Sequence, residues 1–373
     1  SKANKYTFVW KKSVGKWEEK MFQKIQEAVM LLKHEYMQSF SVKIDSRIQD
    51  LQTITRYLEN KCQQNGTVFV YGRGKRKSKN QKYFELFRKF QERQVTYDWH
   101  TASFQGRNNY CKTDPDATFM HMKDDHMRNA QLKPGYNIQI GVDSEYIVAT
   151  DVFSDRNDVW TLIPFLKTMD EKLRFRYPSV TADSGYESEE GYTYLRETRQ
   201  TPYIKPQTYE KWKRRSFKQD ISKRENMAYD AETDVYTCYA QKKLSPVFVK
   251  KQKSKSGYES EVTVYECEDC KDCPHKEKCT RAKGNKRLYV SKSFLEKRQE
   301  SYENILTETG IQYRMNRSIQ VEGAFGVLKN DYEFQKFLLR GKTKVKLEIL
   351  LLCMGYNLNK LHAKIQNERI GLK

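Results

Sequence analysis

The sequence predicts an α/β core that is interrupted by two insertions of different character. Over residues 111–204 the pattern runs through a β-hairpin, a helix, a buried strand that ends in an acid, a second helix and a short strand. A helical segment precedes this core, and a β-rich, basic segment containing cysteines follows it. Strands that alternate with helices are typical of a sheet covered by helices. We therefore expect a mixed sheet flanked by helices, extended by one helical and one β-rich insertion.

The composition is that of a globular and strongly basic protein. The 373 residues include 69 Lys and Arg against 48 Asp and Glu, which gives a net charge of +21. Such a charge favours a polyanionic partner, nucleic acid first, whether the chain is an enzyme or a non-enzymatic binder. The 25 Tyr and 18 Phe supply core and stacking area, which argues against a disordered chain. The sequence contains no run of about 18 apolar residues, so it predicts no membrane span. We expect a cytoplasmic protein.

The first part of the chain predicts helices. Residues 1–10 are expected to form the end of a core strand, and residues 11–110 a helical insertion. Apolar side chains recur at helical spacing over residues 21–36 and 44–58, which predicts an antiparallel helical hairpin. A third helix is expected over residues 83–95. The basic loop before it is either a solvated connection or a phosphate-contacting loop.

Residues 111–204 carry the first part of the predicted core. A Pro-containing turn opens it, and residues 136–153 alternate in polarity as a β-hairpin. A helix begins near Asn157 or Asp158, either of which can cap it. A buried strand then ends in Asp183 and is followed by a helix and a short strand.

The last part of the chain combines the β-rich insertion with the end of the core. Short strands separated by basic or cysteine-rich turns occupy residues 205–291. Residues 292–373 return to helical periodicity, and Ile319, Phe325 and Leu328 are expected to face the core. The nearly apolar C-terminal helix is too short to span a bilayer, so we expect a buried support helix.

Two acids are candidates for chemistry. Asp183 follows a buried strand, where α/β folds place ligands, although a turn or capping role is the structural alternative. Glu322 lies seven residues before Lys329 on one helix, which places both on the same side; an ordinary surface pair is the alternative. Carboxylates are the ligands that hard divalent cations prefer. We expect Asp183 and Glu322 to share two such ions, Mg or Mn, which in phosphodiester chemistry activate the attacking oxygen and stabilise the leaving one.

Three segments together resemble a known family. The hairpin GYNIQIGVDSEYIVATDVFSDRND, the strand TADSGY and the helix VEGAFGVLK follow the order found in bacterial insertion-sequence transposases of the DDE class. These enzymes share the RNase H-like fold with retroviral integrases. The branch with DPDATFM before the hairpin and a Cys-rich insertion before the final Glu is the most similar. The resemblance implies an RNase H-like core, metal-dependent DNA nicking and strand transfer, double-stranded DNA of element ends and target as substrate, and a homodimer.

The resemblance also assigns roles to single residues. Asp183 matches the second metal-binding Asp of the family, and Glu322 matches its final Glu. Lys329 has the family's spacing from that Glu, which implies a DNA contact near the cleaved end. Arg317 and Tyr313 are offset by a position or two from the same pattern, and they are candidate DNA contacts.

The first acid of the family's triad has no clear counterpart. The fold places it on a strand before the hairpin, and in similar members an Asp-Gly-Thr strand comes just before a segment like residues 3–6 of this chain. We therefore expect the first Asp upstream of Ser1, so that this chain is a fragment that binds DNA but cleaves it poorly. Asp116 and Asp143 are the fallback candidates, although a structural or solvent-exposed turn Asp is the simpler interpretation of each.

A second candidate site consists of four cysteines within one short stretch: Cys267, Cys270, Cys273 and Cys279. Thiolates are preferred ligands of tetrahedral zinc. Because the spacing is tighter than in a usual zinc ribbon, His275 or Cys238 can substitute for one of the four. An iron–sulfur cluster and unligated thiols are the alternatives. A zinc ion here would be structural and would clamp an insertion that has few core residues.

Two functions of different classes fit these patterns. The first is a DDE transposase, a polynucleotidyl transferase that is inactive or weak as this fragment. The second is a non-catalytic, zinc-clamped nucleic-acid-binding protein, a decayed or repurposed transposase. Convergence of Asp183 and Glu322 separates the two, since a pure binder does not need both at one site. Residues 11–110 contact either DNA or a second subunit, and the sequence leaves this choice open.

Overall fold

The structure, a computed structural model, describes residues 7–121, 132–334 and 336–367. It forms two compact units, which are Ser1–Tyr136 with Arg340–Lys342 and Asn137–Leu339 with Thr343–Lys373. The segment 3–6 that contributes to the family resemblance lies outside the described residues. None of the helices in the described ranges has the length and apolar character needed to cross a membrane.

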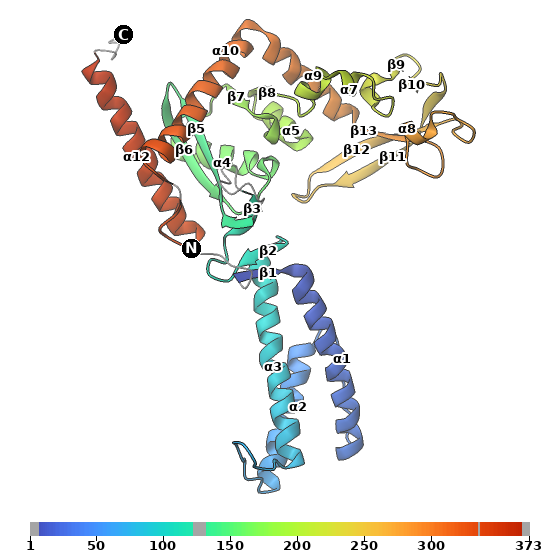
Figure 1. The fold of residues 1–373 in the computed structure, drawn as a ribbon, viewed down its shortest axis with the longest axis vertical. Helices are drawn as coiled ribbons and strands as arrows, with labels where there is room; N and C mark the ends of the chain where they lie inside the picture. Colours follow the sequence, from blue (N-terminus) through green and yellow to red (C-terminus); the bar gives the residue numbers. More distant parts are fainter. Residues whose placement is uncertain (1–6, 122–131, 335, 368–373) are drawn as a thin grey trace. The chain divides into compact units, whose positions relative to one another are not determined.

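Three long helices form the core of the first unit (Figure 1), namely α1 (Lys11–Tyr36), α2 (Arg47–Gln64) and α3 (Lys79–Phe104). Their apolar stripes meet around Ile25, Leu58 and Phe87, which are fully buried. Burial of such a stripe is the main source of stability for an amphipathic helix. The helical periodicity of the sequence is confirmed here. The third helix begins earlier than expected, because Ser78 caps it by accepting a hydrogen bond from the Gln81 backbone.

Two short antiparallel strand pairs complete the first unit. In one, β1 (Phe8–Trp10) pairs with β2 (Asn109–Cys111). In the other, β3 (Thr118–His121) pairs with β4 (Leu132–Gly135).

The Pro-containing turn between these pairs has a structural role. Asp114 accepts hydrogen bonds from Tyr136 Oη at 2.7 Å and from the Gly341 backbone at 3.2 Å. Asp116 Oδ2 accepts a hydrogen bond from the Lys342 backbone at 2.9 Å. Both acids therefore hold the short segment Arg340–Lys342 within the first unit.

The predicted core elements appear in the second unit in the expected order, but as two strand pairs. Antiparallel β5 (Asn137–Asp143) and β6 (Tyr146–Phe153) form a hairpin, and parallel β7 (Ser179–Ala182) and β8 (Thr201–Ile204) are connected through α5 (Glu189–Glu197). The helix α4 (Leu162–Leu173) lies between the two pairs in sequence. Side chains of β6, α4, β7, α5 and β8 contribute to one apolar core. In the described part of the chain no hydrogen-bonded ladder joins β5 to β7, so the expected single mixed sheet is not formed.

The β-rich segment folds as a five-stranded antiparallel sheet with the order β13-β12-β11-β10-β9. Its strands are β9 (Ala228–Asp230), β10 (Val235–Thr237), β11 (Lys243–Lys253), β12 (Glu259–Cys267) and β13 (Arg287–Val290). Figure 1 shows the long β11–β12 hairpin, whose register shifts between Pro246 and Phe248. Such an irregularity bends the paired strands. Short helices α6 (Tyr209–Trp212) and α7 (Arg215–Lys218) precede the sheet, and α8 (Lys276–Cys279) lies before β13.

A run of helices after the sheet carries Glu322. It consists of α9 (Lys292–Leu306), α10 (Glu308–Arg317), the π-helical η5 (Ser318–Glu322), α11 (Gly323–Gly326) and the π-helical η6 (Val327–Asp331). The expectation that Ile319 faces the core is wrong, since its side chain is 68% exposed, whereas Leu328 is buried. A π-helical turn closes its hydrogen bonds over five residues instead of four, so side chains after it no longer follow the α-helical period.

The C-terminal helix α12 (Lys342–Gln366) is less buried than its composition suggests. One face is buried and consists of Val345, Ile349, Cys353 and Tyr356. The other face is exposed and includes Leu347, Leu351 and Met354. The expectation of a buried support helix therefore holds for one face only, because a single stripe of α12 is buried among the described residues.

A buried ion pair ties the loop after β7 to α9. The side chains of Glu187 and Arg298 are 2% and 12% exposed, and Arg298 Nε lies 2.9 Å from Glu187 Oε1 in an orientation unsuited to a hydrogen bond. The Arg298 Nη2 group donates to Thr208 Oγ1 at 2.6 Å, and the Gln207 backbone donates to Glu187 Oε2 at 2.7 Å. Burial raises the pKa of Glu187, whereas these donors oppose the shift. Glu187 lies four residues after Asp183. Its ion pair with Arg298 therefore fixes the loop after β7 against α9.

Replacing Arg298 should destabilise the second unit strongly. Arg298→Met leaves the buried Glu187 carboxylate without its cation, and we expect the free energy of unfolding to fall by about 3–5 kcal/mol. The matched control is Arg196→Met, which removes exposed ion pairs with Glu296 and Glu300 and should cost less than about 1 kcal/mol. Urea titration followed by circular dichroism measures both values, and equal losses would contradict a special role for the buried pair.

Candidate functional site

Asp183 lies directly after β7, at the carboxyl end of the strand. Its side chain is 56% exposed, and it accepts a hydrogen bond from the Ser184 backbone at 2.8 Å. This bond caps the short turn η3 (Ser184–Tyr186), so the capping role considered from the sequence is present. Capping uses Asp183 Oδ1 only, which leaves Oδ2 available for a second function.

Arg317 connects this strand-end acid with Glu322. Arg317 is the last residue of α10, and Glu322 is the last residue of the π-helical segment that follows. Arg317 Nη2 lies 3.9 Å from Asp183 Oδ2, and Nη1 lies 4.0 Å from Glu322 Oε1. One guanidinium group thus lies beside both acids. Both contacts are longer than hydrogen bonds and both carboxylates are more than half exposed, so the ion pairs are weak.

A third carboxylate, that of Asp158, lies against the same loop. The turn η2 (Asp158–Trp160) contacts η3, and a Cβ atom added at Gly185 would lie 3.1 Å from Asp158 Oδ2. Glycine at this position therefore allows the close approach. Asn137 donates to Asp158 Oδ1 at 2.7 Å. The sequence pattern suggested Asp158 only as a helix cap, a role that Asn157 takes by accepting from the Val159 backbone.

Gln139 and Tyr186 join the β5–β6 hairpin to the Asp183 loop. The Tyr186 hydroxyl is hydrogen-bonded to Oε1 of Gln139, whose side chain is buried. Burial raises the pKa of Tyr186 and the charge of Asp158 raises it further, whereas Arg317 opposes the shift. The phenol therefore stays protonated and donates to Gln139. Sequence reasoning missed both residues, although Tyr186 stands in the strand motif TADSGY.

The remaining candidate residues occupy separate positions. Tyr313 packs edge-on against Tyr203 of β8, with ring centroids 5.1 Å apart. Lys329 is exposed on the π-helical segment Val327–Asp331. Asp143 is exposed at the end of β5, four residues or about 13 Å along the strand from Gln139.

Among the residues that the structure describes, no three His, Cys, Asp or Glu side chains are grouped closely enough to hold a metal ion. Asp183 and Glu322 nevertheless have the donor chemistry of a site for a hard cation. Both present exposed carboxylate oxygens, and their counter-charge, Arg317, is held only loosely. A divalent cation bound to both acids could replace Arg317 in that role.

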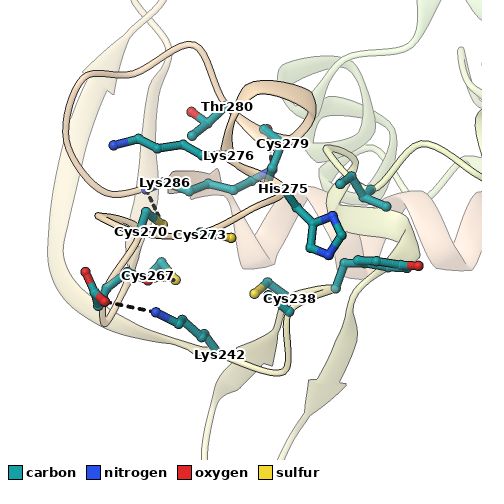
Figure 2. A pocket seen from close by; sticks show the side chains of 14 residues that line it. Cys238, Lys242, Cys267, Cys270, Cys273, His275, Lys276, Cys279, Thr280 and Lys286 are labelled. Carbon is teal, nitrogen blue, oxygen red and sulfur yellow. Dashed lines mark hydrogen bonds and ion pairs between the residues drawn. The ribbon is translucent and has the colours of Figure 1, made fainter.

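A separate small cavity lies among the cysteines (Figure 2). Its volume is about 20 Å³, and its lining includes His275 and five thiols, those of Cys238, Cys267, Cys270, Cys273 and Cys279. Burial, together with the neighbouring Cys270 and Cys238, raises the pKa of Cys267 to about 12. Cys279 Sγ accepts a hydrogen bond from Lys286 Nζ at 3.4 Å. The structure pairs none of the eight cysteines in disulfides.

Removing the shared counter-charge should strengthen metal binding by the two acids. Arg317→Gln removes a cation that lies within 4.0 Å of both carboxylates, and we expect the affinity for Mn²⁺ to rise about two- to tenfold at low ionic strength. Electron paramagnetic resonance of free Mn²⁺ measures the change, and the exposed Arg93→Gln on α3 is the control. A fall in affinity would mean that Arg317 supports the metal site instead of competing with it.

Comparison with known proteins identifies the C-terminal part of the chain. Residues 237–362 match the family described as the transposase DDE domain. The match includes Glu322, Lys329 and the cysteine cluster, whereas Asp183 lies before it. No curated protein and no solved structure matches the chain. Residues 237–362 are therefore similar to the transposase DDE domain family, which confirms the resemblance of the chain to DDE-class transposases.

Proposed function

We propose that this chain carries the catalytic site of a DNA transposase that nicks the ends of an insertion sequence and transfers the strand to a target. The observation that carries the proposal is the meeting of Asp183 and Glu322 at the Arg317 guanidinium, at the carboxyl end of β7. An ordinary surface Glu has no reason to meet a strand-end acid far away in sequence. The family match over Glu322 supports the same class of enzyme.

Asp183 and Glu322 would hold divalent ions, Mg or Mn. When bound, such ions supply activation of the attacking oxygen and stabilisation of the leaving oxygen in phosphodiester chemistry. The overall reaction has two stages. First, water attacks the phosphorus and the bond to the 3′ oxygen breaks, which leaves a free 3′-hydroxyl. That hydroxyl then attacks a phosphodiester of the target DNA, joins to it and releases a new 3′-hydroxyl.

Other residues of this chain would position the acids and the DNA. The buried Glu187–Arg298 pair and the Tyr186–Gln139 hydrogen bond fix the Asp183 loop against α9 and β5. Arg317 would bind a phosphate group of the DNA once a metal ion neutralises Asp183 and Glu322. Lys329 lies on the helical run that carries Glu322, and it would contact DNA near the cleaved end. Tyr313 is a further candidate contact on α10.

The first acid would come from a strand placed between β5 and β7. In the described residues β5 pairs only with β6 and β7 only with β8, so each has one unpaired edge. The Tyr186–Gln139 bond and the shared apolar core draw the two strand pairs together. We propose that sequence preceding Ser1 supplies this strand and its Asp, in an RNase H-like sheet. Asp158 is the better substitute within the chain, because Asp143 lies at the far end of β5 and Asp116 holds Lys342 in the first unit.

The net charge of +21 supports double-stranded DNA as the partner. Lys and Arg that neutralise phosphates release counterions, so affinity for DNA should fall steeply as salt is added. Pairing of two element ends would be the task of a homodimer.

A second candidate is a non-catalytic DNA-binding protein descended from a transposase. The lack of a third acid grouped with Asp183 and Glu322, in the ranges that the structure describes, favours it. Such a protein would bind DNA through its basic surface and would gain nothing from metal at the two acids.

The two candidates differ in what the acids contribute. We expect this chain to bind duplex DNA but to nick plasmid DNA poorly with Mg²⁺ or Mn²⁺, because the proposed first acid lies on a strand outside it. The polypeptide extended through the residues encoded before Ser1 should nick at least about 100-fold faster, and Asp183→Asn or Glu322→Gln should remove that gain. The affinity for DNA should be unchanged in both variants. Lys329→Ala should instead weaken DNA binding, and the slope of log affinity against log salt concentration should fall by about one, the value for one phosphate contact.

Glu303→Gln, an exposed acid on α9, is the control for the carboxylate variants. Fast nicking by this chain alone, lost in Asp158→Asn, would move the first acid from the upstream strand to Asp158. An extended polypeptide that binds DNA but never nicks it would favour the non-catalytic protein.

A further inference from the structure

The five-stranded sheet brings together cysteines that are widely separated in sequence. Cys238 follows β10, and its backbone N donates to the Lys242 carbonyl at 2.9 Å. Cys267 ends β12, where its Cα partner on β11 is Leu244. Positions 242 and 244 are two residues apart, so their cross-strand neighbours lie on the same face of the sheet. Cys238 and Cys267 therefore point to one side, and both belong to the small buried core there.

The turn after β12 adds two more thiols to the same place. Cys270 and Cys273 line the cavity together with Cys238 and Cys267, and Figure 2 shows their four sulfur atoms directed into the same space. The backbone of Lys286 donates to Cys270 Sγ at 3.4 Å. Backbone N–H groups directed at sulfur stabilise a thiolate more than a neutral thiol.

Two lysines surround these thiols. Lys286 is only 5% exposed, and its Nζ donates to the carbonyl oxygens of Ser222 and Cys279, at 2.7 and 3.1 Å, and to Cys279 Sγ. Among the described residues, the contacts of this buried ammonium are thus neutral oxygens and a sulfur, without a carboxylate. A buried charge is costly unless an opposite charge lies near. Lys242 is also near: its hydrogen bond to Asp269 raises its pKa, and the charges of Cys273 and Cys267 raise it further.

We propose that Cys238, Cys267, Cys270 and Cys273 bind one structural zinc ion. Zinc favours four thiolates in a tetrahedral arrangement, and a complex of four thiolates with Zn²⁺ is an anion that gives Lys286 and Lys242 their counter-charge. The cavity of about 20 Å³ admits one ion or one water molecule. Because no three of the described ligands are yet grouped at a metal distance, the side chains must close around the ion as it binds.

This ligand set differs from the one that spacing alone predicts. The proposed set contains Cys238 in place of Cys279. Cys279 is left out because its sulfur and its carbonyl both accept hydrogen bonds from Lys286. The ion would tie the β10–β11 turn to the loop after β12. The sheet needs such a link, because β9 and the neighbouring β10 have three residues each and most of β11 is exposed.

Metal analysis of the purified chain and its variants tests the proposal. Mass spectrometry of the elements should find about one zinc per chain, lost in Cys238→Ser and in Cys270→Ser but retained in Cys279→Ser. If a variant fails to fold, the wild-type chain gives an independent readout. After removal of zinc by a chelator, Co²⁺ should restore binding with the intense visible and thiolate charge-transfer bands of a tetrahedral, four-sulfur site.

Three results would overturn the proposal. A wild-type chain that contains no zinc and gives no Co²⁺–thiolate bands would show unligated thiols. Zinc retained in Cys238→Ser and lost in Cys279→Ser would restore the ligand set predicted from spacing. Iron with acid-labile sulfide in place of zinc would identify a cluster. None of these measurements depends on DNA nicking, so the transposase proposal stands or fails separately.

Discussion

The position of Glu322 relative to Asp183 depends on how α9 is fixed to the strands β7 and β8. The buried Glu187–Arg298 ion pair joins α9 to the loop that begins at Asp183. Ser301 on the same helix is fully buried; its hydroxyl donates to the Ile204 carbonyl and accepts from the Ile204 backbone. These contacts hold α9 against β8 and against the loop that follows β7. A single extended residue, Thr307, separates α9 from α10, and the π-helical segment follows α10 directly. These elements carry Arg317 and Glu322 to the Asp183 loop.

A second constraint is the pair of unsatisfied strand edges. Backbone groups at the edge of a strand need partners, and an open edge readily accepts another strand. In the described residues β5 and β7 each have one such edge, while side chains of β6, the partner of β5, already share a core with those of β7. A strand inserted between them would complete the sheet and place its end beside Asp183. The same loop is reached by Asp158, which Gly185 admits at close range, so the acidic character of the site does not rest on two residues alone.

The sequence predicted much of this fold because hydrophobic periodicity is local. Local patterns predicted the long helices of the first unit, the β5–β6 hairpin, the strand β7 with Asp183 directly after it, and the β-rich segment. The sequence could not show that Arg317 lies beside both acids, or that Asp158 approaches the Asp183 loop, because these contacts join distant segments. The burial of Ile319 was predicted wrongly, since π-helical turns leave no simple sequence period. Cys238 was considered only as a substitute ligand, because its place near Cys267 depends on strand register.

The central claim is that Asp183 and Glu322 bind the same divalent ion. Fe²⁺ that replaces Mg²⁺ in such a site generates radicals with ascorbate and peroxide, and these cut the backbone next to the ion. After the cysteines are loaded with zinc, mass spectrometry of the fragments locates the cuts. The account predicts cuts both within Asp183–Tyr186 and within Ser318–Glu322, suppressed together by excess Mg²⁺ and lost together in Glu322→Gln. Cuts at only one of the two segments, or cuts that Mg²⁺ does not suppress, would contradict it.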